Sequence, residues 1–152
     1  MAEIWFYHLT DSTLHAALPT LLEKSLARGW RAAVEVPDER LRDALDTHLW
    51  TFQDGSFLAH GVDVAKNMEP ADQPILLTVG GGNANGAQVR FLGGGAMPGD
   101  GIEAYKRVVL MFDGHDEAQL ADARAAWKSL KAEGHDVTYW QQGEGGGWRK
   151  MA

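Results

Sequence analysis

An alternation of short apolar runs with leucine-rich helical periods opens the chain, and it constrains the fold more than any other feature. Residues 4–8 form an aromatic-rich run that is typical of a strand, and leucines then recur at helical spacing until Gly29. A second strand is predicted at residues 31–36, before a helix that begins with Pro37. The order strand, helix, strand, helix favours a sheet with helices packed on its faces.

The rest of the chain predicts four more strands and one long helix. Glycine-rich sequence separates the first two of these strands, so we expect a loose hairpin there. The predicted strands are residues 75–79, 88–92, 105–112 and 137–141, and the helix is residues 116–131. Together the elements predict an α/β, Rossmann-like three-layer domain with a mixed, mostly parallel sheet.

Length and composition indicate one domain. The 152 residues, of which 45% are hydrophobic, suffice for one self-sufficient core and are too few for two comfortable domains. We place this domain at residues 1–142 and expect the glycine-rich residues 143–152 to form a flexible tail. No signal peptide and no apolar run of about 18 residues is recognised, so we expect a cytoplasmic protein.

The overall charge disfavours one class of function, direct binding to nucleic acid. The formal net charge is −7 at pH 7, whereas a protein that grips phosphates needs a dominant basic surface. The basic residues are unevenly distributed, because seven of the fourteen lie from Lys106 onward. We therefore expect no direct DNA binding, but a local cationic patch can coexist with an acidic whole.

Patterns typical of catalysis or of cofactor binding are weak. Gly80, Gly82 and Gly86 miss the GxGxxG spacing by one residue, and the sequence after them favours a strand rather than a helix. The six histidines show no metal-ligand spacing, cysteine is absent, and no serine lies in GxSxG. We predict no catalytic, cofactor-binding or metal site. A nucleotide-binding α/β enzyme whose site residues are dispersed along the chain stays open as an alternative.

The helix at residues 116–131 presents a basic and aromatic face. At 100° per residue, Arg124, Trp127, Lys128 and Lys131 fall within one arc together with Leu120. Cationic groups beside an indole suit a ligand that carries both negative charge and a ring, such as an acidic, aromatic peptide. Two alternatives remain: a solvated basic stripe with one scattered tryptophan, and a single-stranded nucleic-acid-binding surface with the indole as a stacking platform.

Trp50 and Phe57 form a second candidate surface. They lie at the end of a predicted helix and in the polar loop after it, where no periodicity demands that aromatic side chains be buried. They either pack the loop onto the domain or anchor a partner protein.

Short stretches in a specific order resemble the chi subunit of bacterial DNA polymerase III holoenzyme, a clamp-loader accessory. The likeness spans nearly the whole chain, and no single motif in it is long. It is carried by residues 6–9, 49–50, 57–60, 74–77, 108–114, 123–128 and 139–142.

The resemblance implies a non-catalytic subunit of Rossmann-like fold that links the clamp loader to single-stranded DNA-binding protein. The link runs through the acidic C-terminal tail of that protein, which ends in Pro-Phe. Arg124, Trp127 and Lys128 occupy the places of the basic and aromatic residues that hold the tail in chi proteins. Trp127 stands where better-studied members carry tyrosine, a change that keeps a ring but loses a hydroxyl group.

The resemblance also implies a second partner. In the family, another face binds the psi subunit of the clamp loader, and in some lineages a helicase competes for it. Trp50 and Phe57 match the aromatic positions of that face. The glycine-rich middle of the chain and the tail that contains Trp148 depart from better-known members of the family.

Overall fold

The computed structural model describes residues 3–10, 13–51, 60–62, 71, 73–80, 83–99, 101–142 and 148–151. Its strands are β1 (Glu3–Leu9), β2 (Ala32–Val36), β3 (Gly61–Val62), β4 (Ile75–Val79), β5 (Val89–Leu92), β6 (Arg107–Asp113), β7 (Asp136–Gln142) and β8 (Trp148–Lys150). Its helices are α1 (Leu14–Ala27), α2 (Glu39–Thr51), α3 (Glu117–Ala132) and the short 3-10 helix η2 (Ile102–Ala104).

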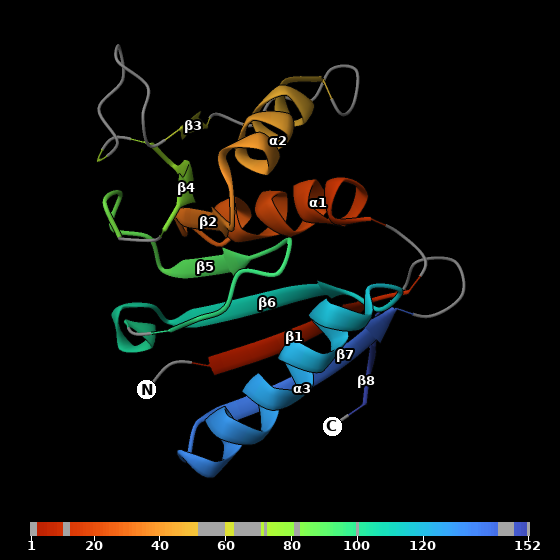
Figure 1. Ribbon diagram of the computed structural model, residues 1–152. Coiled ribbons are helices and arrows are strands. Elements are labelled where there is room, and N and C mark those ends of the chain that lie inside the picture. The colour runs from red at the N-terminus through yellow and green to blue at the C-terminus, as the bar shows by residue number, and fades with distance from the viewer. Residues whose placement is uncertain are drawn as a thin grey trace.

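The described strands form one sheet in the order β3-β4-β2-β5-β6-β1-β7-β8. Neighbouring strands are parallel throughout, except that β8 runs antiparallel to β7. Figure 1 shows α3 in front of the half of the sheet that contains β1 and β7, whereas α1 and α2 lie toward the half that contains β2 and β4. The predicted three-layer α/β fold with a mixed, mostly parallel sheet is confirmed.

Alternation along β1 sends its side chains into two hydrophobic cores, one on each face of the sheet. Ile4 and Phe6 belong to the core beneath α3, whereas Tyr7 and Leu9 belong to the core beneath α1 and α2. All four side chains are buried. Strand β1 is paired on both sides, so it lies inside the sheet, and each of its faces contributes to one of the two cores.

Local sequence explains where the helices begin and end. The Thr13 side chain accepts a hydrogen bond from the backbone N–H of Ala16 and so caps α1, and Gly29, at φ 80°, follows the end of the helix. The Asp116 carboxylate caps α3 by accepting from the backbone N–H groups of Ala118 and Gln119. These are the start and stop signals expected for two amphipathic helices.

The predicted hairpin between residues 75–79 and 88–92 is wrong. Strands β4 and β5 do not pair with each other; both run parallel to β2 and lie on its opposite sides. The chain must therefore return to the other end of the sheet between them. Asn85 fixes this return, because its side-chain amide donates to the carbonyl oxygens of Ala32, the first residue of β2, and of Gln73, two residues before β4.

The stretch after residue 142 contributes an edge strand. Residues 148–150 form β8, which pairs with the end of β7, and the backbone N–H of Met151 donates to the carbonyl oxygen of Tyr139. Residues 143–147 lie outside the described residues. The division into a domain at 1–142 and a flexible tail at 143–152 stays a prediction for that segment, and Trp148 itself is half-buried against the sheet.

Candidate functional site

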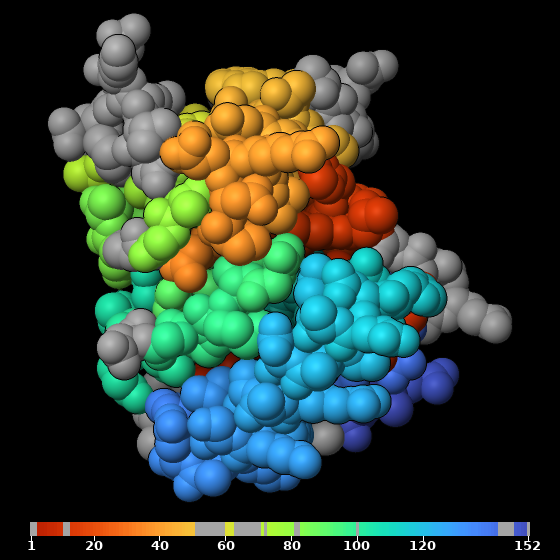
Figure 2. Space-filling model, in the orientation of Figure 1, coloured from red at the N-terminus to blue at the C-terminus, as the bar shows by residue number. Residues whose placement is uncertain are grey.

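A hollow of about 340 Å³ lies between α3 and the strands beneath it. We call it the α3 pocket, and it is lined by Phe112, Leu120, Ala123, Arg124, Trp127, Lys128 and Tyr139. In Figure 2, α3 crosses the front of the molecule, and residues near the end of the chain reach the surface beside it. The pocket is lined by four residues of the basic and aromatic helix face that was predicted from the sequence.

The helix turns its basic and aromatic face toward this pocket because its apolar residues are held in the core. Ala123 and Leu130 are buried against the sheet. That orientation brings Leu120, Arg124 and Trp127 to the pocket, together with Lys128. Lys131 does not line the pocket, but its Nζ atom lies 5.3 Å from the centroid of the Trp127 ring, within cation–π range.

Trp127 forms one wall of the pocket and is fixed by two edge-to-face contacts. Its ring centroid lies 5.5 Å from that of Phe6, at an interplanar angle of 80°. It lies 5.8 Å from that of Tyr139, at 89°. Edge-to-face pairs of this kind stabilise by about 0.5–1.5 kcal/mol beyond the area they bury, so the indole is held in place before any ligand arrives.

A hydrogen-bonded pair of rings supports the opposite side. His8 Nδ1 lies 2.5 Å from the Tyr139 hydroxyl oxygen, and the His8 ring stacks on Phe112 at 4.8 Å between centroids. Burial lowers the pKa of His8, and the positive charge of Arg124 lowers it further. Burial also raises the pKa of Tyr139, an effect that Arg124 partly offsets. A neutral histidine and a neutral phenol therefore sit beside Arg124.

Three cations at or beside the α3 pocket have no acidic partner among the described residues. Arg124, Lys128 and Lys131 are exposed, and none of the three forms an ion pair within the described part of the chain. Arg90 and Arg107, by contrast, are bonded to Glu35 and Glu3 at 2.7 and 2.9 Å. Unpaired positive charge beside an apolar hollow suits a ligand with a carboxylate and a ring.

Three residues in or behind the α3 pocket were not predicted from the sequence. Phe112 and Tyr139 come from β6 and β7, and His8, behind them, comes from β1. Helical periodicity reports only residues on the same helix, whereas these strands meet through parallel pairing of distant segments. A signal in the sequence was the alternation of side chains along a strand. It places Phe6 and His8 on one face of β1, and the strand register puts Tyr139 beside Phe6 and Phe112 beside His8.

The second candidate surface is described only in part. Trp50 lies on α2, is 48% exposed, and its ring centroid lies 4.3 Å from that of His60. His60 is buried, and its Nε2 atom lies 3.0 Å from Asp46 Oδ1. Phe57 lies outside the described residues. The structure thus places an exposed indole at this surface, and its proposed aromatic partner stays a prediction.

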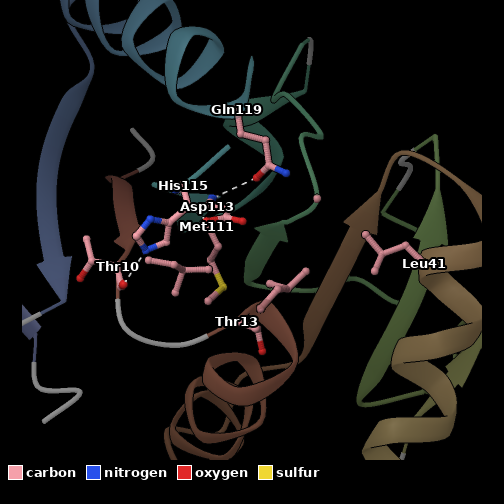
Figure 3. A pocket seen from close by; sticks show the side chains of 10 residues that line it. Thr10, Thr13, Leu41, Met111, Asp113, His115 and Gln119 are labelled. Atoms are coloured by element: carbon pink, nitrogen blue, oxygen red, sulfur yellow. Dashed lines mark hydrogen bonds between the residues drawn. The ribbon is translucent and has the colours of Figure 1, made fainter. Parts of the chain in front are cut away.

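A further hollow lies at the carboxyl ends of the strands, where parallel α/β sheets commonly bind ligands. Figure 3 shows its polar groups turned toward one another: His115 Nε2 lies 2.8 Å from the Thr10 carbonyl oxygen, and the backbone N–H of Asp113 donates to Gln119 Oε1 at 3.0 Å. The adjoining glycine Gly94 lies against Leu41 rather than against open space. These contacts give the alternative of a nucleotide-binding enzyme no support.

Among the described residues, no group of three or more histidine, cysteine or acidic side chains is placed so that it could hold a metal ion. No helix in that part of the chain has the length and apolar character needed to cross a membrane.

Comparisons with known proteins agree on one family. A family model described as "DNA polymerase III chi subunit, HolC" matches residues 1–138, which include all of α3 and the first residues of β7. A protein of Rickettsia prowazekii (strain Madrid E), described as "Probable DNA polymerase III subunit chi", is 25% identical over 122 residues. The aligned region covers 74% of this chain and 71% of that protein.

Proposed function

The chain belongs to the DNA polymerase III chi subunit family, which gives it an accessory role in DNA replication, and we propose that its α3 pocket binds the acidic C-terminal tail of single-stranded DNA-binding protein. In this proposal the chain does not catalyse a reaction; it links the clamp loader of the holoenzyme to coated single-stranded DNA. One observation carries the proposal: three cations that form no ion pair with any described residue stand beside an apolar hollow with aromatic walls.

Each side chain has a distinct role in the proposed complex. Arg124 clamps the terminal carboxylate of the tail, because a guanidinium can donate two parallel hydrogen bonds to a carboxylate. Lys128 and Lys131 attract the aspartates that precede the terminus. Trp127 and Tyr139 enclose the terminal phenyl ring, between the helix and the strands. A free carboxylate identifies a chain end, which an internal peptide segment cannot mimic.

Trp127 has no hydroxyl group, unlike the tyrosine of better-studied family members, but the α3 pocket contains another phenol. The phenol of the α3 pocket belongs to Tyr139, and its hydroxyl group is already bonded to His8. We therefore assign Trp127 an apolar role against the phenyl ring and leave polar recognition to Arg124 and the lysines. The edge-to-face contacts of Trp127 support this assignment, because they fix the ring without a hydrogen bond.

We also propose a second partner surface at Trp50 and Phe57 for the psi subunit, or for another clamp-loader or helicase protein. The supporting observation is the 48% exposure of Trp50, since a large apolar side chain at the surface is a common anchor of protein interfaces. Trp50 lies on α2 and the tail pocket on α3, so the two partners can bind together.

One experiment separates the proposed function from its alternatives. Fluorescent single-stranded DNA is titrated with this protein, first bare and then coated with its binding protein, either intact or lacking its last residues. The proposal requires a response only to DNA coated with the intact protein. A response to bare DNA would favour a nucleic-acid-binding module, and thermal stabilisation by a nucleotide would favour an enzyme.

A further inference from the structure

The face of the sheet opposite α3 carries a second hollow, of about 430 Å³, beside the last turns of α1. We call it the α1 pocket. Its floor includes Trp5 and Tyr7 of β1, its near wall includes Leu21 and Arg28, and Trp148 of β8 forms part of its far wall. None of these residues takes part in the function proposed above.

Strand β1 separates the two pockets. The Phe6 ring contacts Trp127 on the α3 side, whereas Trp5 and Tyr7, its neighbours in the chain, face the α1 pocket. Adjacent residues of a strand point to opposite faces, so the two hollows are separated by the thickness of the sheet. A ligand in one pocket therefore leaves the other accessible.

Three aromatic side chains of the α1 pocket each have one ring face in contact with another side chain. Tyr7 and Trp148 stack on each other, with centroids 4.4 Å apart and planes at 19°. The guanidinium carbon of Arg107 lies 3.6 Å from the centroid of Trp5. A nucleobase binds single-strand sites by stacking on an open aromatic face. These contacts disfavour a nucleobase and favour a side chain that packs against ring edges and the aliphatic wall.

Two exposed cations line this hollow, Lys24 and Arg28 at the end of α1. Neither forms an ion pair within the part of the chain that the structure describes. The guanidinium carbon of Arg28 lies 4.1 Å from the centroid of the Trp30 ring, an aromatic contact that leaves its charge without an acidic partner among the described residues. In a protein of net charge −7, cations of this kind at an aromatic hollow are complementary to an acidic ligand.

We propose that the α1 pocket is a second site for an acidic peptide that inserts an aromatic side chain, on the face opposite the α3 pocket. This proposal takes its ligand class from the function proposed above, because both hollows combine aromatic walls with unpaired cations. Lys24 and Arg28 hold the acidic groups of the peptide, and Leu21, Tyr7 and Trp148 enclose its ring. One molecule then holds two tails, one on each face.

The tryptophan indole N–H signals in a proton–nitrogen correlation spectrum report the two pockets separately. Trp127 reports the α3 pocket, and Trp5 and Trp148 report the α1 pocket. The full chain is titrated with a short aspartate-rich peptide that ends in Pro-Phe, and the signals are assigned with Trp127→Phe and Trp148→Phe. We expect two saturable responses. A Trp127 response that saturates while the Trp5 and Trp148 signals stay still overturns the second site.

Substitutions distinguish this proposal from the first. Arg28→Glu should weaken the response of Trp148 about tenfold and leave that of Trp127 unchanged, because a reversed charge repels an acidic ligand. Arg40→Glu is the matched control, since Arg40 is exposed on α2 and lines neither pocket. Arg124→Ala should weaken the Trp127 response alone.

The outcomes for the two pockets are independent. A Trp148 response without a Trp127 response removes the function proposed for the α3 pocket and supports the α1 pocket. Loss of the Trp148 response in Arg124→Ala means that both signals report one site, which overturns the second. A thymidine oligonucleotide that shifts Trp148 at lower concentration than the peptide does would assign the face to nucleic acid instead and overturns the proposal.

Discussion

At the scale of single residues, Arg124 lines the α3 pocket with an exposed guanidinium that forms no ion pair in the described part of the chain. We expect Arg124→Ala to weaken tail-peptide binding by about 2 kcal/mol or more, near thirtyfold in Kd, because a few residues usually carry most of the affinity of such a site. Calorimetric titration of the peptide measures the loss.

The control for this substitution is Arg40→Ala, which removes the same side chain from the exposed face of α2. It should leave the Kd of the peptide within about twofold, since isolated surface charges contribute little. A loss below about threefold for Arg124→Ala would remove that residue from the tail site.

His8 gives the protein a predictable pH dependence. Burial and the charge of Arg124 lower its pKa below the ordinary 6.5, and burial together with His48 lowers that of His15. Below pH 6.5 the unfolded chain therefore binds protons that the folded chain does not, so stability is present above that pH and is lost as pH falls. The slope is at most about 1.4 kcal/mol per pH unit for each histidine.

Urea unfolding at a series of pH values tests this sign. The free energy of unfolding should decline as pH falls below 6.5, and His8→Gln should make the decline shallower. A free energy of unfolding that rises between neutral pH and pH 6 would show that the folded state binds protons in this range, contrary to the prediction.

Sequence predicts the residues of the α3 pocket that lie on one helix, but not those that come from separate strands. Arg124, Trp127 and Lys128 share one helix, and helical spacing alone placed them on one face. Phe112 and Tyr139 reach the same pocket from β6 and β7, two strands that lie on either side of β1 and are far apart in the sequence. Nothing local in the sequence encodes that meeting, because it depends on sheet order.

At the scale of elements, α2 carries the second proposed partner surface. Trp50→Ala should abolish binding of a psi-like partner, because it removes the large exposed side chain at the surface of that helix. Tail binding on α3 should stay within about twofold, since the two sites are on different helices. Binding is measured by co-elution with the reconstituted clamp loader and by peptide titration. If both activities are lost, Trp50 supports the fold and is no anchor.

One of the glycines that follow β5 has a packing role. Gly94 lies at φ 66°, and a Cβ atom there would collide with Leu41 of α2. Gly94→Ala should therefore cost about 2–5 kcal/mol of unfolding free energy, because overpacking of about 1–3 kcal/mol adds to a backbone penalty of about 1–2 kcal/mol.

Gly99→Ala is the matched substitution. Gly99 also has a positive φ, 49°, but nothing lies within 4 Å of the Cβ position. It should therefore cost only the backbone penalty, about 1–2 kcal/mol. Equal losses for the two variants in urea unfolding would mean that the contact with Leu41 contributes nothing.

The wrongly predicted hairpin shows that sequence patterns identify strands but do not identify the strands with which they pair. The strands at 75–79 and 89–92 were recognisable as apolar runs, yet the partner they share is β2, more than thirty residues earlier in the chain. Short separation and glycine favour a hairpin, whereas the amide of Asn85 holds the return segment against the starts of β2 and β4. Long-range pairing decided the topology.

At the scale of the whole molecule, the distribution of charge sets how tail binding responds to salt. The chain carries a net charge of −7, which repels an acidic peptide at long range, while Arg124, Lys128 and Lys131 attract it at contact. Charges at contact outweigh the net charge, because the latter is spread over distances beyond the Debye length of about 10 Å at 0.1 M salt.

The prediction is that salt weakens binding: raising ionic strength from about 0.05 M to about 0.5 M should increase the Kd of the tail peptide roughly three- to tenfold. Calorimetric titration at a series of sodium chloride concentrations measures this. A peptide with asparagine in place of its aspartates is the control, and its weaker Kd should vary much less, because only the terminal carboxylate remains charged. Tighter binding at high salt would mean that the net negative charge dominates, and the cations of α3 would then not be the groups that recognise the tail.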